Sequence, residues 1–184
     1  MKPLMFLKNF ITDKDIASVA PSSRFSVNKL CKKIDFNKNN VIVEYGPGTG
    51  VITYPLLRRM NKNSKLIVLE QNKNFCRHLK KNKDPRFIVE NDVAQNVQEI
   101  LKKHGVEKAD YIISGIPLSF FPNKEKSLLM RQTYNCLNPQ GRFLVYQFSR
   151  HAEKYLEKNF DYVKKDFELL NIPPLAIFEA IKKN

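Results

Sequence analysis

The sequence predicts an α/β protein built on a mostly parallel sheet with helices on both faces. Short apolar runs such as Val41–Tyr45 alternate with segments of helical periodicity over most of the 184 residues. This alternation is typical of parallel strand–helix–strand units. Near the C-terminus, two strand-like segments, 162–172 and 175–183, are separated by Pro173 and Pro174 without a helix between them. We therefore expect them to add an antiparallel hairpin to the sheet.

The elements follow one another without an obvious linker or internal repeat, so we predict a single domain over residues 1–184. Residues 1–33 form its helical N-terminal extension. In this extension, 1–13 reads as an amphipathic helix, Pro21 interrupts it, and Ser22 or Ser23 can cap a second helix. The five expected parallel strands are 41–45, 65–70, 86–92, 109–114 and 142–148. The expected helices are 50–60, 72–81, 94–104 (closed by Gly105), 123–137 (capped by Asn123) and 150–158, with a turn at 138–141.

Charge and cysteine content narrow the function classes. The formal net charge of +14 favours a polyanionic partner, either nucleic acid or an anionic membrane surface, although a lysine-rich solubilising surface is an alternative. The cysteines Cys31, Cys76 and Cys136 are isolated, which argues against a zinc site and a disulfide scaffold and favours a reducing cytosol. We expect no metal. The sequence contains no evident secretory signal and no apolar stretch long enough to cross a bilayer.

The strongest local signal is the glycine turn after the first strand. Glu44 ends that strand, and Gly46, Gly48 and Gly50 follow at every second position, where a ligand can approach the backbone closely. A nicotinamide site would have the spacing G-x-G-x-x-G, and an acid beside it would repel a pyrophosphate. An acid suits an ammonium group instead. Glu70 ends the next strand, where a carboxylate can bind ribose hydroxyls. The electrostatics therefore favour S-adenosylmethionine as the cofactor.

The segment "VEYGPGTG" resembles motif I of the class I, Rossmann-like S-adenosylmethionine-dependent methyltransferases. The order of elements matches that fold over nearly the whole chain, which implies a seven-stranded sheet. Three further segments, "SVAPSS", "SGIPLSFFP" and "LNIPPLAIFEA", together resemble the bacterial phospholipid N-methyltransferases. These enzymes methylate phosphatidylethanolamine and related aminolipids. The resemblance implies an enzyme that transfers methyl groups to the amine of a membrane aminophospholipid, without saying which lipid or how many methyl groups.

The resemblance also assigns residues. It places Asp92 near the adenine amino group and Pro117 in the segment between methyl group and acceptor. Tyr146, on the same edge, could order the substrate amine or be an ordinary half-buried strand tyrosine. Helix capping is the alternative for Glu70 and Asp92, and core packing the alternative for Tyr45. No general base can be named. The complete cofactor-binding set is Glu44, Tyr45, Gly46, Pro47, Gly48, Gly50, Glu70, Gln71, Asp92, Val93, Ser114 and Gly115.

A lipid substrate gives the N-terminal helix a purpose. Residues 1–13 can bind an anionic membrane surface or pack over the domain as a lid, and we expect a cytoplasmic, peripherally membrane-associated monomer. One rival is an enzyme resembling the rRNA adenine dimethylases, which carry an N-[LI]-P-[YF] pattern where this chain has Ser114–Leu118. Another is a non-catalytic basic binding protein of the same fold.

Overall fold

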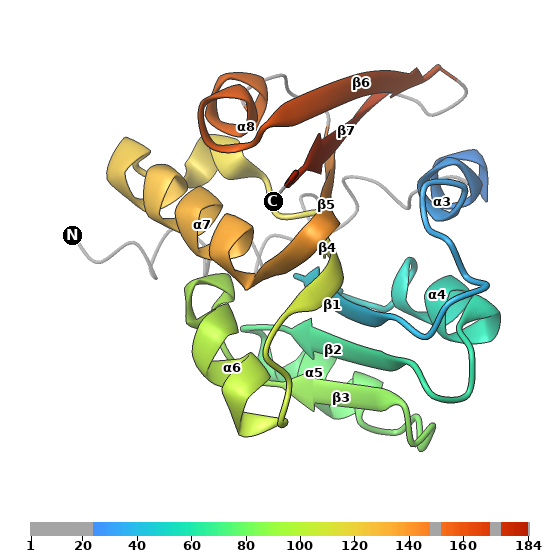
Figure 1. Cartoon of the computed structure of the whole chain (residues 1–184). Helices are drawn as coiled ribbons and strands as arrows, with labels where there is room; N and C mark the ends of the chain where they lie inside the picture. Colours follow the sequence, from blue (N-terminus) through green and yellow to red (C-terminus); the bar gives the residue numbers. More distant parts are fainter. Residues whose placement is uncertain (1–23, 148–151, 170–173, 184) are drawn as a thin grey trace.

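The computed structural model describes residues 24–147, 152–169 and 174–183. Those residues form one seven-stranded sheet in the order β3-β2-β1-β4-β5-β7-β6 (Figure 1). Only β7 runs against its neighbours, β5 and β6, and the other neighbouring pairs are parallel. The mostly parallel sheet and its antiparallel C-terminal hairpin are therefore confirmed. The strands are β1 (Val41–Tyr45), β2 (Lys65–Leu69), β3 (Phe87–Glu90), β4 (Ala109–Ser114), β5 (Leu137–Gln147), β6 (Tyr162–Glu168) and β7 (Leu175–Ile181).

Helices cover both faces of the sheet, as Figure 1 shows. Helices α3 (Arg24–Cys31), α4 (Thr53–Arg59) and α5 (Lys73–Leu79) pack on one face, and α6 (Val97–Lys103), α7 (Asn123–Cys136) and α8 (Glu153–Asn159) on the other. Two short 3-10 turns, Ala94–Asn96 and Leu118–Phe120, precede α6 and α7. The central strand β1 is buried on both faces, which explains why its sequence is apolar except for the carboxylate near its end.

The strand order fixes where a ligand can bind. From β1 the chain builds outward through β2 to β3, then crosses back to place β4 on the other side of β1. The loops after β1 and β4 therefore diverge at the C-terminal edge of the sheet, and this divergence opens a crevice in doubly wound folds. We call this edge the site edge. The predicted candidate residues follow the ends of β1, β2, β3, β4 and β5, so all of them lie along it.

Some predicted boundaries change for local reasons. The helix expected over 50–60 begins only at Thr53, because Gly50 has a φ of +88° and cannot join a right-handed helix. The turn expected at 138–141 lies inside β5, where Gln140 has a φ of +63° and the pairing with β4 shifts register. Gly105, with a φ of +64°, closes the α6 segment as predicted.

The capping role predicted for Asn123 is wrong. Pro122 occupies the cap position of α7, and the Asn123 side chain instead accepts a hydrogen bond from the Tyr155 hydroxyl at 2.6 Å. The predicted helix over 1–13 and the caps Ser22 and Ser23 lie outside the described residues. The single domain over 1–184 stays a prediction. Among the described helices, none is long and apolar enough to span a membrane.

Candidate functional site

The glycine loop after β1 is held in a conformation that requires its glycines. Gly46, Gly48 and Gly50 have φ angles of +66°, +56° and +88°, a region that residues with a Cβ rarely adopt. The Gly46 N–H donates to the Leu69 carbonyl at 2.9 Å, so the loop is tied to the end of β2. A Cβ on Gly46 would lie only 3.0 Å from Ile116 in the loop after β4. The two diverging loops are therefore in contact at the site edge.

Glu44 is fully buried beside this loop. Its Oε2 accepts a hydrogen bond from the Thr53 hydroxyl at 2.7 Å, and its Oε1 has no hydrogen-bond partner among the described residues. Burial raises the pKa of Glu44 from 4.5 to about 7, the Thr53 hydrogen bond opposes this rise, and the charge of Glu70 adds to it. A buried carboxylate oxygen without a donor is costly, so this atom is suited to receive a cationic donor from a ligand.

Glu70 joins the end of β2 to the glycine loop. Its Oε2 accepts from the Gly48 N–H at 3.0 Å and its Oε1 from the Asn72 N–H at 2.8 Å. Burial raises the pKa of Glu70, while these backbone hydrogen bonds lower it in part. Each carboxylate oxygen has a second lone pair, so both can still accept a hydroxyl donor. The neighbouring Gln71 is partly exposed.

Asp92 is the third acidic residue on this edge. Its Oδ1 accepts from the Val93 N–H and from the Asn96 amide, both at 2.7 Å, at the start of the turn that precedes α6. Val93, not Asp92, occupies the cap position of that turn, so the capping alternative is wrong for Asp92; one of its carboxylate oxygens is used within its own loop, and the side chain remains partly exposed. Because β1, β2 and β3 are adjacent and parallel, Glu44, Glu70 and Asp92 follow one another along the site edge.

The ends of β4 and β5 form the other half of the site. Ser114 is fully buried, and its hydroxyl accepts from the Ile116 N–H at 3.3 Å. A Cβ on Gly115 would lie 2.3 Å from the Tyr146 hydroxyl, so only glycine lets the Tyr146 ring lie against this loop. The partly exposed Pro117 follows in the same loop.

The Tyr146 side chain lies against the loop after β4, at the site edge. Its hydroxyl makes no hydrogen bond with any described residue, and its side chain is partly exposed, whereas the fully buried Tyr45 hydroxyl has a partner in Thr133. Burial raises the pKa of Tyr146 strongly, and the charge of Glu44 adds to this rise, which places the two groups in one environment. The phenol is therefore neutral near pH 7 and can accept or donate a hydrogen bond but cannot act as a general base.

The Tyr45 side chain points away from the glycine loop, so the expectation that it packs beside the cofactor is wrong for this side chain. Successive residues of a strand point to opposite faces, so Glu44 and Tyr45 diverge. The Tyr45 hydroxyl shares a 3.2 Å hydrogen bond with the Thr133 hydroxyl of α7, and its ring meets Phe143 edge-on. The core-packing alternative is correct for this side chain.

Sequence reasoning missed Thr53 as a site residue. It is fully buried at the start of α4 and supplies the one hydrogen bond that Glu44 receives among the described residues. A threonine at a helix start ordinarily indicates a cap, so its type and position gave no separate signal. Thr53 follows the last glycine of the loop by three residues, and the turn of this loop places its hydroxyl next to Glu44 at the end of β1.

The sequence of this chain is similar to those of known proteins. Residues 36–183 match a family model described as a methyltransferase domain. The chain belongs to this family. The methyltransferase is 33% identical over 167 residues to an ornithine lipid N-methyltransferase of Singulisphaera acidiphila, covering 89% of this chain and 86% of the relative. It is 30% identical to a ribosomal RNA small subunit methyltransferase A of Mycoplasma mycoides, over 60% of this chain but only 37% of that relative.

A solved structure has the same fold. The magnesium protoporphyrin IX methyltransferase of Synechocystis, determined with bound S-adenosylmethionine, superposes with a TM-score of 0.72 at 10% identity, covering 100% of this chain and 98% of the other. The chain is a class I methyltransferase, and enzymes of this class use S-adenosylmethionine. The unpartnered Oε1 of Glu44 fits that cofactor, because its α-ammonium group can supply the missing donor.

Proposed function

We propose that this methyltransferase transfers methyl groups from S-adenosylmethionine to the amine of a membrane aminolipid. The observation that carries the substrate class is the 33% identity to an ornithine lipid N-methyltransferase across most of both chains. The ribosomal RNA relative is similar over a much smaller part of its length. The basic charge of +14 is consistent with work at an anionic bilayer surface.

The glycine loop and three carboxylates are the proposed cofactor site. Glu44 would accept a hydrogen bond from the ammonium group through Oε1, and Glu70 would accept from ribose hydroxyls. Asp92, with one oxygen already occupied by its own loop, would offer the other to the adenine amino group. Bound there, the cofactor supplies an electrophilic methyl group on a positively charged sulfur, which leaves as a neutral thioether.

The acceptor side has the simpler task of positioning a neutral amine. The nitrogen lone pair forms the new N–C bond as the C–S bond breaks, so catalysis depends mostly on alignment and on excluding water. We assign Tyr146 to positioning, because its unpartnered neutral hydroxyl can hydrogen-bond the amine. The amine must lose its proton to solvent before the transfer, since no described side chain of this half-site is suited to be the base.

The proposal includes a peripheral membrane location on the cytoplasmic side. Aminolipids stay in the bilayer, so the enzyme must reach them at the interface. The predicted helix over 1–13 is one candidate for this contact.

Methyl-labelled S-adenosylmethionine tests the proposal directly. The purified protein is incubated in parallel with vesicles containing phosphatidylethanolamine, vesicles containing an ornithine lipid, and total RNA. We expect label in at least one lipid amine and none in RNA. Vesicles of phosphatidylcholine, whose nitrogen has no lone pair, are the matched control. Label in RNA with none in either lipid would overturn the proposal and favour an RNA substrate.

A further inference from the structure

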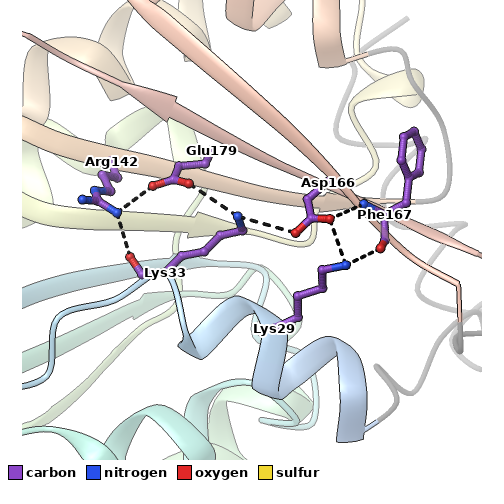
Figure 2. A network of polar contacts seen from close by, with 6 residues as sticks. All are labelled: Lys29, Lys33, Arg142, Asp166, Phe167 and Glu179. Carbon is purple, nitrogen blue, oxygen red and sulfur yellow. Dashed lines mark hydrogen bonds and ion pairs between the residues drawn. The ribbon is translucent and has the colours of Figure 1, made fainter.

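Helix α3 is fixed to the C-terminal hairpin by an ion-pair network (Figure 2). Lys29 contacts the Asp166 carboxylate at 2.9 Å and also donates to the Phe167 carbonyl. One turn later, Lys33 lies 3.4 Å from Glu179 and 3.8 Å from Asp166. The same Glu179 accepts from a guanidinium nitrogen of Arg142 at 2.6 Å, and that nitrogen also donates to the Lys33 carbonyl at 3.1 Å. Glu179 is almost fully buried, so the network is anchored in the sheet rather than on a loose surface.

The strand register shows which end of α3 faces the site. Asp166 of β6 pairs with Ile177 of β7, and Ile177 pairs with Tyr146 of β5. The contact between Lys29 and Asp166 is therefore level with the site tyrosine. Lys33, in the turn that follows the helix, contacts Glu179, which pairs with Leu144, farther from the site edge. Helix α3 thus points its N-terminal end toward the site edge.

Exposed apolar side chains gather at this same edge. Among the described residues, six large apolar side chains are more than a third exposed, and four of them lie at the site edge: Phe25 (54%), Val51 (39%), Phe167 (43%) and Leu169 (73%). We call these four the apolar rim. Tyr162, at the opposite end of β6, and Leu128, on α7, are the other two.

The rim is assembled from segments far apart in the sequence. Phe25 lies one helical turn before Lys29, on the same side of α3, so the ion pair with Asp166 brings it to the end of β6. The Phe167 ring points away from α3 in Figure 2, and Leu169 follows at the end of the strand. Val51 belongs to the loop of the three glycines. Apolar groups thus flank the site from both faces of the sheet.

We propose that the apolar rim docks onto the surface of an anionic bilayer and turns the site edge toward the lipid headgroups. This inference rests on the proposed function, because an aminolipid acceptor must enter from the bilayer. The positive charge of the protein favours an anionic bilayer over a neutral protein surface as the partner of the apolar rim. The chain carries a net charge of +14, and the exposed Lys164 lies on β6 between the rim residue Phe167 and Tyr162. Exposed apolar groups surrounded by basic ones are typical of interfacial membrane contacts.

Tryptophan reporters test the docking geometry, since the chain contains no tryptophan. Leu169→Trp places a reporter in the rim, and Tyr162→Trp places a matched reporter on the same strand at the far edge. Vesicles of phosphatidylglycerol with brominated acyl chains are then added. We expect quenching and a blue shift for Leu169→Trp and no change for Tyr162→Trp. Equal responses at both positions, or a response only at Tyr162→Trp, would overturn the proposal.

A binding assay measures the contribution of the rim. The triple variant Phe25→Ser, Phe167→Ser, Leu169→Ser should sediment with these vesicles about a hundredfold more weakly than the unaltered protein, as expected for three partly buried side chains. The control Tyr162→Ser should bind normally. Unchanged vesicle binding in the triple variant would contradict the proposal. So would loss of self-association without loss of vesicle binding, which would identify the occupant as a second copy of the chain.

The assay also separates this inference from the proposed function. On a monomeric short-chain aminolipid dissolved in water, the triple variant should methylate as fast as the unaltered protein and lose rate only on vesicles. Rim-dependent vesicle binding without methylation of any lipid by the unaltered protein would support docking while refuting the aminolipid substrate. Equal loss of rate on both forms of the lipid would refute docking as the role of the rim.

Discussion

Glu44→Gln tests the electrostatic design of the cofactor site, because the substitution keeps the shape of the side chain and removes its charge. Burial holds the pKa of Glu44 at about 7 in the folded protein without ligand, against an ordinary value of 4.5. Below pH 4.5 the carboxyl is protonated in both the folded and the unfolded chain. As the pH rises toward 7, the unfolded chain loses this proton first, so the folded state loses stability. The total loss is roughly 3 kcal/mol.

The Glu44→Gln variant does not have this penalty. We expect it to be more stable than the unaltered protein at pH 8, by up to roughly 3 kcal/mol, and about equally stable at pH 4.5. Addition of S-adenosylmethionine should reverse the order, because the carboxylate gains a cationic partner that the amide cannot replace. Urea denaturation at pH 4.5 and 8, with and without the cofactor, measures these differences.

Glu90→Gln is a control with the opposite sign. Burial alone would raise the pKa of Glu90, but hydrogen bonds from Lys103 and His104 outweigh it and lower the pKa. This group therefore stabilises the fold above its ordinary pKa and loses that effect as the pH falls, so Glu90→Gln should be less stable than the unaltered protein at pH 8. If Glu44→Gln is also destabilised at pH 8 without cofactor, the account of Glu44 is wrong.

Three further expectations concern the loops and the pH dependence. Gly48→Ala should cost about 1 kcal/mol of folding free energy, because only its left-handed backbone is strained. Gly50→Ala should cost roughly 3 kcal/mol, because its Cβ would also lie 2.6 Å from the Tyr54 ring. Urea denaturation measures both costs, and equal values for the two variants would contradict this explanation. Gly115→Ala should displace Tyr146 and lower kcat by about tenfold or more, a larger effect than its change in cofactor affinity measured by calorimetry. The rate should rise by about tenfold per pH unit below the pKa of the acceptor amine, and a pH-independent rate in that range would show that the protein supplies a base.

The parallel sheet, its order of elements and the terminal hairpin were predictable, because their signals are local in the sequence. Val41–Tyr45 is too apolar to be anything but a strand buried on both faces, and glycines at every second position can only form a loop. The carboxylates Glu44 and Glu70 could be placed at the site edge for the same reason, since parallel strands share one direction.

Three features depended on contacts that no local pattern encodes. The alternation of the strand places Tyr45 opposite Glu44, but which of the two faces the core depends on a distant partner, the Thr133 hydroxyl of α7. The buried hydroxyl of Thr53 resembled an ordinary helix cap until its partner was known. The apolar rim needs Lys29 and Asp166 to meet across 137 positions of the sequence, and no spacing rule predicts such a pair.

The central claim is that the acceptor is the headgroup nitrogen of a membrane aminolipid. Tandem mass spectrometry of the lipids recovered after incubation with S-adenosylmethionine tests it most directly, because fragmentation assigns each added methyl group to the headgroup or the acyl chains. We predict methyl groups on the nitrogen of phosphatidylethanolamine or of an ornithine lipid, and none on phosphatidylcholine in the same vesicles. Methyl groups only at carbon or oxygen, or unmodified lipids beside methylated RNA, would contradict the account.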